Sequence, residues 1–276
     1  ADHDGASTPP PAELAPEQVG LNDTPPDPDD KIRRNLFFAS FGNDANAEVY
    51  RSFGLLESLH YLNQQHGLRP AESDRDPEVM AIGDVDFEPM DSNFGGYQAV
   101  DAAGYQILLT YRSPNQIAQR VSLSDILANA VDPELIAGNV VLIGSTAYIS
   151  NDKFFTPYSL RSDSYQMSGV EVHLHMISQF LSAVLDDYPL SWAWADWAEI
   201  AWIIAWASGG SLATWRLRRQ RYLGMAYGSG VGAIAGTTVL FFLKNAWIPL
   251  AAPLTAFSLA SGSLLLYRRY RQRRRT

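Results

Sequence analysis

Ser145, Asp152 and His173 are the residue types of a hydrolase triad, in which histidine accepts the serine proton and aspartate orients the histidine. Such a serine commonly lies in a Gly-x-Ser-x-Gly turn, but Ile143 and Ala147 stand where the two glycines would be. The chain also lacks a Gly-x-x-x-x-Gly-Lys phosphate loop and a dinucleotide fingerprint. We therefore expect no catalytic residues, no cofactor and no enzyme activity.

Glu171, His173 and His175 are metal-ligating residue types close together in the sequence. Positions i and i+2 of a helix point apart by about 200°, so the two histidines cannot hold one ion together there. Glu171 and His175 are four residues apart and could, but a glutamate near a helix start more simply interacts with the helix dipole. The chain has no cysteine, which excludes disulfides and thiolate ligands. We expect no metal site.

The loop after Asn139–Ile143 is the best candidate for a binding site. This apolar run predicts a buried, central strand, and ligands in α/β sheets gather beyond the carboxyl ends of strands. Glycine permits close backbone approach there, and hydroxyls supply hydrogen bonds. The predicted ligand-binding residues are Gly144, Ser145, Thr146, Asp152, Thr156 and His173. The alternative is that these polar groups only hold an irregular loop together, as Asp and Thr commonly do.

Apolar runs bounded by turn residues predict the strands that must position this loop. They lie at 19–21, 31–40, 79–82, 96–100 and 104–111, besides 139–143. Between them, helical stripes predict a helix over 44–66, capped by Asn43 or Asp44 and ended by Gly67, a short helix begun by Ser122 with Asp125, and a long helix over 170–185. The alternation favours an α/β domain over residues 19–190, with a partly parallel mixed sheet and flanking helices. Residues 1–18 are rich in proline and acids and are expected to be disordered or extended.

Charge divides the chain into two parts. Residues 1–190 contain 10 basic and 28 acidic residues, a net charge of −18, whereas 191–276 contain 11 basic and 2 acidic residues, a net charge of +9. The acidic part lacks the basic face of a nucleic-acid binder, so we expect no nucleic-acid partner. In the basic part the arginines are clustered, and long uncharged runs separate the clusters.

These uncharged runs predict an all-α anchor of three membrane helices, because about 20 residues of helix cross a ~30 Å hydrocarbon core. The expected spans are 197–215, 222–243 and 247–267, followed by a basic cytoplasmic tail over 268–276. Most of the seven tryptophans lie near the ends of the runs, as in an aromatic belt. The excess of arginine on one side predicts that residues 1–190 are extracytoplasmic, in a multi-pass protein of the bacterial inner membrane.

Two sets of residues in this anchor have predicted roles, one in lipid contact and one in helix packing. The cytoplasmic basic anchors, expected to contact anionic membrane lipid, are Arg216, Arg218, Arg219, Arg221, Arg268 and Arg269. The predicted helix-packing residues repeat every fourth position, at Gly224, Gly228, Gly232 and Gly236. This glycine stripe packs either against the first or third helix of the same chain or against a second copy in a homodimer.

Several motifs together resemble one family. They are Val140-Val-Leu-Ile-Gly-Ser-Thr-Ala147, Asp152-Lys-Phe-Phe-Thr-Pro157, Gly169-Val-Glu-Val-His173 and Asp27-Pro-Asp-Asp-Lys-Ile-Arg-Arg34. Together they resemble the CHASE sensors of the second type, which are extracytoplasmic domains associated with cyclases and histidine kinases. Asp30 stands where that family usually has glycine. The resemblance implies three membrane helices after the domain, and it implies that the chain is the C-terminal part of a longer sensor whose output domain follows.

The sequence therefore predicts a sensory module that binds an unknown small ligand or an extracytoplasmic protein and passes a signal through the membrane helices. The alternative is a membrane-anchored assembly or structural subunit, whose outer domain docks another protein.

Overall fold

The computed structural model describes residues 11–41, 48–113, 117–147, 152–159, 166–217 and 219–274. The chain forms two compact units. The first contains residues 1–90 and 101–190, and the second contains residues 91–100 and 191–276. Predicted features at 1–10, Asn43, Asp44 and Arg218 lie outside the described residues.

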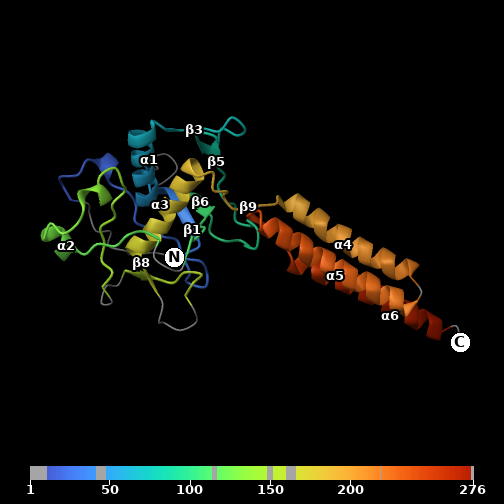
Figure 1. Cartoon of the computed structure of the whole chain (residues 1–276). Helices are drawn as coiled ribbons and strands as arrows, with labels where there is room; N and C mark the ends of the chain where they lie inside the picture. Colours follow the sequence, from blue (N-terminus) through green and yellow to red (C-terminus); the bar gives the residue numbers. More distant parts are fainter. Residues whose placement is uncertain are drawn as a thin grey trace. The chain divides into compact units, whose positions relative to one another are not determined.

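Three small antiparallel sheets build the first unit (Figure 1). One has the order β2-β1-β6, another is the meander β3-β4-β5, and the last is the pair β7-β8. The strands are β1 (Arg34–Phe41), β2 (Glu48–Arg51), β3 (Pro70–Glu72), β4 (Met80–Ile82), β5 (Val85–Phe87), β6 (Tyr105–Leu108), β7 (Lys153–Phe154) and β8 (Met167–Ser168). In the β1–β2 pair, Phe38 lies opposite Arg51, and in the β1–β6 pair, Arg34 lies opposite Leu108.

Two long helices, α1 (Phe53–His66) and α3 (Gly169–Leu185), pack on one another, with Gly54 in van der Waals range of Met176. The unit also contains the short α2 (Leu123–Leu127) and two 3-10 turns, Pro16–Gln18 and Pro133–Leu135.

The main core lies between these helices and the strands. Phe87 stacks on Phe180 with ring centroids 4.5 Å apart, and Phe37 meets both rings edge-on. Two buried amides fasten α3 to the sheet: Gln179 Nε2 donates to the Leu108 carbonyl at 2.8 Å, and Asn35 donates to Gln179 Oε1 at 3.3 Å. Because these polar groups satisfy one another, they add geometric specificity to an otherwise apolar contact.

Several predicted elements are confirmed. The strands at 31–40, 79–82 and 104–111 correspond to β1, β4 and β6, and the helix at 170–185 corresponds to α3. The Ser122 side chain accepts from the Asp125 amide at the start of α2, as its spacing indicates. Gly67 ends α1 in the left-handed region, with φ 67°.

Other predictions are wrong. Residues 48–51 form β2 rather than helix, because Ser52 caps α1 by accepting from the Leu55 amide. The segment 96–100 is a loop with Gly95 and Ala99 at positive φ. The sheet is not partly parallel: the strand pairs of this unit are antiparallel, and its described parallel pairing is limited to the single bridges Leu21–Ser52 and Lys31–Phe155.

The run 139–143, predicted as a central strand, is extended but belongs to no sheet among the described residues. Val140 and Leu142 are half-buried, whereas Val141 is 49% and Ile143 92% exposed. This alternation is that of an extended segment with one covered face. The prediction of extended backbone is therefore confirmed, and the prediction that both faces are buried is wrong.

The second unit contains three long helices that run side by side (Figure 1). They are α4 (Asp196–Arg216), α5 (Gln220–Phe242) and α6 (Ala251–Arg273), and β9 (Trp192–Ala193) pairs in parallel with β10 (Ala246–Trp247). Among the described residues, α5 is the one helix whose length and hydropathy qualify it to cross a membrane.

The glycine stripe does not face the neighbouring helices. A Cβ atom at Gly224, Gly228, Gly232 or Gly236 would meet no described atom within 4 Å. Close helix contact uses other glycines instead: a Cβ on Gly210 or on Gly230 would lie 2.8 Å or 2.5 Å from the Phe257 ring. Of the two alternatives for the stripe, packing within the chain is therefore not what the structure shows.

The turn at Asp27–Lys31 generates a prediction about Asp30, whose φ is 61°. Its amide donates to the Asp27 carbonyl at 2.8 Å, and the Asp27 amide donates to the Lys31 carbonyl at 2.9 Å. The left-handed region strains a residue with a Cβ atom, so we expect Asp30→Gly to raise the free energy of unfolding of the first unit by about 0.5–1 kcal/mol. Hydrogen exchange of the β1 amides measures this change. Asp30→Ala is the matched control, because alanine keeps the Cβ atom, and it should not slow the hydrogen exchange of the β1 amides. Slower exchange in Asp30→Ala than in Asp30→Gly would contradict the view that the Cβ atom of Asp30 is strained.

Candidate functional site

The predicted binding loop lies against the start of α3. Gly144 is so close to Val170 that a Cβ atom on it would lie 2.6 Å from the Val170 Cβ. A Cβ atom on Gly169 would likewise lie 2.2 Å from Oδ1 of Asp152. The Gly169 amide donates to the Asp152 carbonyl at 3.3 Å. Lys153 Nζ donates to the Thr146 carbonyl at 3.2 Å. The structure thus brings 144–146 and 152–153 together at the start of α3.

Two of the predicted hydroxyls are engaged locally. Thr156 is fully buried, and its Oγ1 accepts from the Tyr158 amide at 3.3 Å while its own amide donates to Ser159 Oγ at 3.0 Å. Ser145 is exposed, and its Oγ accepts from the Ala147 amide at 3.4 Å. At these positions the alternative interpretation, polar groups that shape a loop, accounts for the observed hydrogen bonds.

Glu171 serves as a helix cap. Its Oε2 accepts from the Ser168 amide at 3.0 Å and from Ser168 Oγ at 2.6 Å, which makes a capping box at the start of α3. Arg120 pairs with the other oxygen. These bonds lower the pKa of Glu171, although burial opposes them. No group of three His, Asp or Glu residues suited to a metal ion occurs in the described part of the chain.

The two histidines of α3 are buried among different neighbours. His173 lies edge-on to Phe53 at 5.4 Å, and His175 lies 4.9 Å from Tyr111. Neither Nδ1 atom has a hydrogen-bond partner among the described residues. Burial lowers the pKa of His173, against the opposing charge of Asp152, and lowers the pKa of His175 to about 4. Both imidazoles are therefore neutral at pH 7 and act as core side chains.

A cavity of about 250 Å³ opens beside this region. Val140 and Leu142 line one side, Leu174, Ile177 and Leu181 of α3 line the other, and no predicted binding residue contributes. The apolar lining lies on the strand-like segment itself rather than on the loop that follows it.

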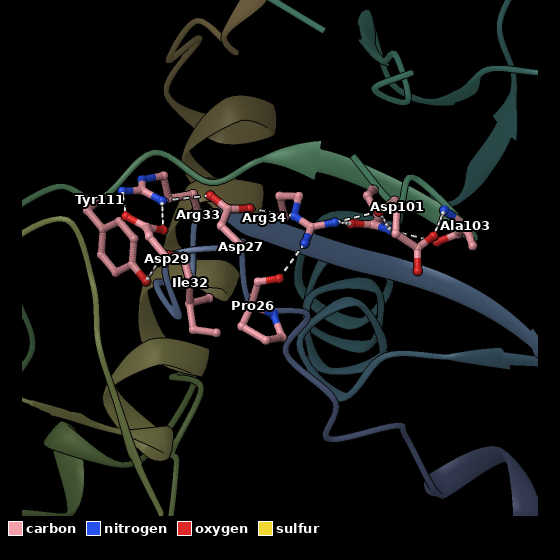
Figure 2. Close-up of polar contacts among 10 residues, drawn as sticks. Pro26, Asp27, Asp29, Ile32, Arg33, Arg34, Asp101, Ala103 and Tyr111 are labelled. Atoms are coloured by element: carbon pink, nitrogen blue, oxygen red, sulfur yellow. Dashed lines mark hydrogen bonds and ion pairs between the residues drawn. The ribbon is translucent and has the colours of Figure 1, made fainter. Parts of the chain in front are cut away.

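A network of ion pairs and hydrogen bonds around Arg34 joins the 26–32 turn to strands β1 and β6 (Figure 2). Arg34, 3% exposed, donates from Nε to Asp27 Oδ1 at 2.9 Å and from Nη2 to the Pro26 carbonyl at 2.6 Å. Its Nη1 donates to Gln106 Oε1 at 2.9 Å and to the Asp101 carbonyl at 2.6 Å. Each nitrogen of the guanidinium is hydrogen-bonded, which is what allows an arginine to be buried.

The neighbouring Arg33 extends the network to the surface. It forms a two-pronged pair with Asp29, at 2.6 and 2.8 Å, and also donates to Asp27 Oδ2 at 2.8 Å. The pair with Arg33 lowers the pKa of Asp29 to about 2 and raises the pKa of Arg33. The Asp27–Arg34 motif singled out in the sequence is therefore a structural joint.

This joint holds both stems of the loop 91–100. The Met90 amide donates to the Gln106 carbonyl at 2.7 Å, and Asp101 gives its carbonyl to Arg34. The loop between these stems belongs to the second unit. It closes on itself, since the Val100 amide donates to the Ser92 carbonyl at 3.0 Å.

The loop packs on Trp247. A Cβ atom on Gly96 would lie 2.4 Å from the indole, one on Gly95 would lie 2.8 Å from it, and the Tyr97 ring lies 5.6 Å from it. Sequence reasoning missed this contact because it read 96–100 as a strand. The adjacent glycines were the available signal, since paired glycines mark close approach of backbone to another group.

The first unit is thus a mixed α/β domain, and its described polar clusters are hydrogen-bonded within the fold. A family model, the CHASE2 domain, matches residues 4–212. The chain belongs to the CHASE2 family, whose members are extracytoplasmic sensor domains of membrane proteins. Comparisons with curated proteins and with solved structures returned no match.

The buried state of His175 generates a prediction about pH. Its pKa of about 4 in the folded chain lies below the unfolded value near 6.5, so the unfolded chain binds more protons between these values. We expect the stability of α3 to be intact above pH 6.5 and to fall as the pH falls toward 4, by at most about 1.4 kcal/mol per pH unit for this group. Hydrogen exchange of α3 amides at pH 7 and pH 5 measures the fall.

His175→Phe should make this fall smaller, because phenylalanine keeps the ring contact with Tyr111 and cannot be protonated. His60→Phe, at an exposed position of α1, is the control. An equal fall in wild type and His175→Phe would show that burial of His175 does not govern the acid sensitivity.

Proposed function

We propose that the chain is the extracytoplasmic sensory module of a bacterial transmembrane receptor, whose three helices pass a signal to a cytoplasmic output domain. Family membership supports the sensory part. The charge division supports the topology, because the acidic part would lie outside and the arginine clusters would lie on the cytoplasmic side.

The surfaces of α4 and α6 support membrane insertion beside α5. Ile200 and Ile204 of α4 are 57% and 58% exposed, and Leu259 and Leu266 of α6 are 70% and 67% exposed. Large apolar side chains on the outside of helices are unfavourable in water and favourable in lipid. Arg268 donates to the carbonyls of Thr214 and Leu217 and so joins the basic end of α6 to the carboxyl end of α4.

The observation that carries the proposal is the position of the loop 91–100. Its stems are held by Arg34 and Gln106 of the sensor sheet, and its tip packs on Trp247 at the turn between α5 and α6. The chain itself therefore connects the sensor sheet to the tip on Trp247, and we infer that a change at the stems reaches the tip along this connection. A ligand would drive this change by binding one of two arrangements of the sheet more tightly.

The proposed ligand-binding residues remain Gly144, Ser145, Thr146, Asp152, Thr156 and His173, with a small molecule or an extracytoplasmic protein as ligand. The glycine stripe of α5 is outward-facing and suits close approach of a second α5 helix, so we propose it as the seam of a homodimer. The basic anchors contact lipid headgroups on the cytoplasmic side.

One observation favours the alternative of an assembly subunit. A group of large apolar side chains between α2 and the 139–143 segment is exposed: Leu123, Ile126, Leu127, Leu135, Ile136, Val141 and Ile143. Such a group suits a protein partner better than a small ligand. Both functions use the same anchor, and they differ in whether the outer domain must change shape.

The topology generates a prediction that the chain makes easy to test, since it has no cysteine. Asp84→Cys places a single thiol at the exposed β4–β5 turn, and Gln272→Cys places one near the end of α6. We expect a membrane-impermeant maleimide to label the first in intact cells and the second only after permeabilisation. Lys244→Cys, at the turn after α5, should behave like Asp84→Cys. Equal labelling of the first two in intact cells would overturn the topology.

The loop contact generates a prediction about Gly96. A methyl group there overlaps the indole of Trp247, and overpacking of this kind costs about 1–3 kcal/mol. We expect Gly96→Ala to speed hydrogen exchange of residues 92–100 by about fivefold or more while α1 amides are unchanged. Gly262→Ala, at a helical position with no described atom within 4 Å, is the matched control. Unchanged hydrogen exchange in Gly96→Ala would contradict the proposal that the signal passes through the contact between Gly96 and Trp247.

A further inference from the structure

Residues 117–147 form a segment of defined local structure that has no core of its own. Ser122 caps α2, and Asp132 caps the 3-10 turn that follows it. No residue of this segment is buried, and seven large apolar side chains between Leu123 and Ile143 are exposed. Short helices are marginal in water, and a monomeric protein rarely exposes so many apolar side chains in one stretch. The segment therefore needs a surface that covers it.

The extended run 140–144 indicates what kind of surface is missing. No hydrogen bond joins its backbone amides and carbonyls to any residue in the described part of the chain. A row of unpaired N–H and C=O groups on extended backbone is the template on which another strand pairs. An added strand would meet these groups one after another, which a helix or a small molecule cannot do.

The side chains of this run divide between two faces. Val141 and Ile143 are exposed, whereas Val140 and Leu142 are half-buried and line the cavity beside α3. The side chains of an added strand would alternate in the same way, so that every second one faces α3.

The cavity itself suits peptide side chains better than a small molecule. Its volume of about 250 Å³ is below the about 300–1,000 Å³ that is usual for a small-molecule site. Its two charged lining residues, Arg112 and Asp186, form an ion pair with one another at 3.7 Å. The lining that α3 contributes is apolar or carries hydroxyls: Leu174, Ile177, Ser178, Leu181, Ser182 and Leu185.

Charge selects the kind of partner. Residues 121–147 contain three carboxylates, Asp125, Asp132 and Glu134, and no lysine or arginine. All three are exposed, and none of the ion pairs in the described part of the chain involves them. The run 139–147 is itself uncharged and contains no proline, so nothing in it opposes strand pairing.

A second copy of the chain is a poor occupant of this face. Residues 1–190 have a net charge of −18, so two such outer parts repel one another. Charge complementarity instead favours a polypeptide with basic residues beside its apolar strand.

We propose that 140–144 receives an added β-strand from a partner protein, and that this strand is uncharged, rich in β-branched residues and flanked by lysine or arginine. Backbone pairing would supply affinity, and the exposed apolar side chains and carboxylates would supply specificity. The inference rests on the proposed function in taking an extracytoplasmic protein as the ligand. It adds where that protein binds and by what chemistry, for a receptor and for an assembly subunit alike.

Fluorescence anisotropy tests this with the full chain in phosphatidylcholine nanodiscs, which carry no net charge. The probe is the labelled synthetic peptide Lys-Arg-Val-Thr-Val-Thr-Val-Lys-Arg. We expect saturable binding that weakens as the salt concentration rises, because basic flanks meet carboxylates. The same peptide N-methylated at its five central residues should not bind, since it lacks the backbone donors. Glutamate in place of the four basic residues should weaken binding about tenfold or more.

Two valine variants locate the site. Val141→Asp should weaken binding about tenfold or more, because it places a negative charge at the pairing edge without touching a buried position. Val49→Asp is the matched control, since Val49 is an exposed valine of β2, the edge strand of the sensor sheet, and it should bind as wild type does. Asp132→Asn with Glu134→Gln should reduce the salt dependence. Circular dichroism checks that each variant is folded.

The outcomes that overturn the proposal are distinct. Absence of binding, binding that Val141→Asp leaves unchanged, or binding that Val49→Asp abolishes would reject the site. Binding without salt dependence would reject a basic partner, and an oligomeric mass that falls in Val141→Asp would assign the face to a second copy. The maleimide labelling described above is independent of the peptide. Absence of binding together with the expected labelling rejects this inference and leaves the proposed topology standing.

Discussion

The buried pair of Arg34 and Asp27 is the interaction on which the sensor sheet depends. Burial of an arginine is expensive unless its nitrogens are hydrogen-bonded, and here the carboxylate of Asp27, the side chain of Gln106 and two backbone carbonyls bond all three nitrogens of Arg34. A pair of this kind adds little net stability compared with apolar packing. Its value is geometric, because it fixes the 26–32 turn, β1 and the start of β6 to one another.

That geometry extends to the loop 91–100. The two stems of the loop end at Met90 and Asp101, and both are hydrogen-bonded to residues of the network. The tip of the loop is fixed differently, since a Cβ atom added to Gly95 or Gly96 would lie 2.8 or 2.4 Å from the indole of Trp247. The loop is thus hydrogen-bonded at its stems and packed on a ring at its tip.

The sequence predicted what depends on local periodicity and missed what depends on distant partners. The stripe of α3 and the serine cap of α2 are local, and both are confirmed. The 44–66 helix failed at its start because pairing with β1 outweighed the helical pattern of 48–51. The bond pattern of Arg34 needed Gln106 and Asp101, about 70 residues away, and the contact of Gly96 needed Trp247. Spacing along the chain contains no information on either encounter.

The glycine stripe and the run 139–143 show a second limit of prediction from sequence. In both, a pattern read as evidence of close packing faces outward in the single chain: the stripe meets no described atom within 4 Å, and Ile143 is 92% exposed. A sequence records burial wherever it occurs, in one chain or between chains, and does not distinguish the two. An extended apolar edge is costly to leave exposed in water, and glycines allow a second backbone to approach closely. The outward faces of α5 and of 139–143 are therefore where the proposed homodimer seam and the proposed protein partner would make their contacts.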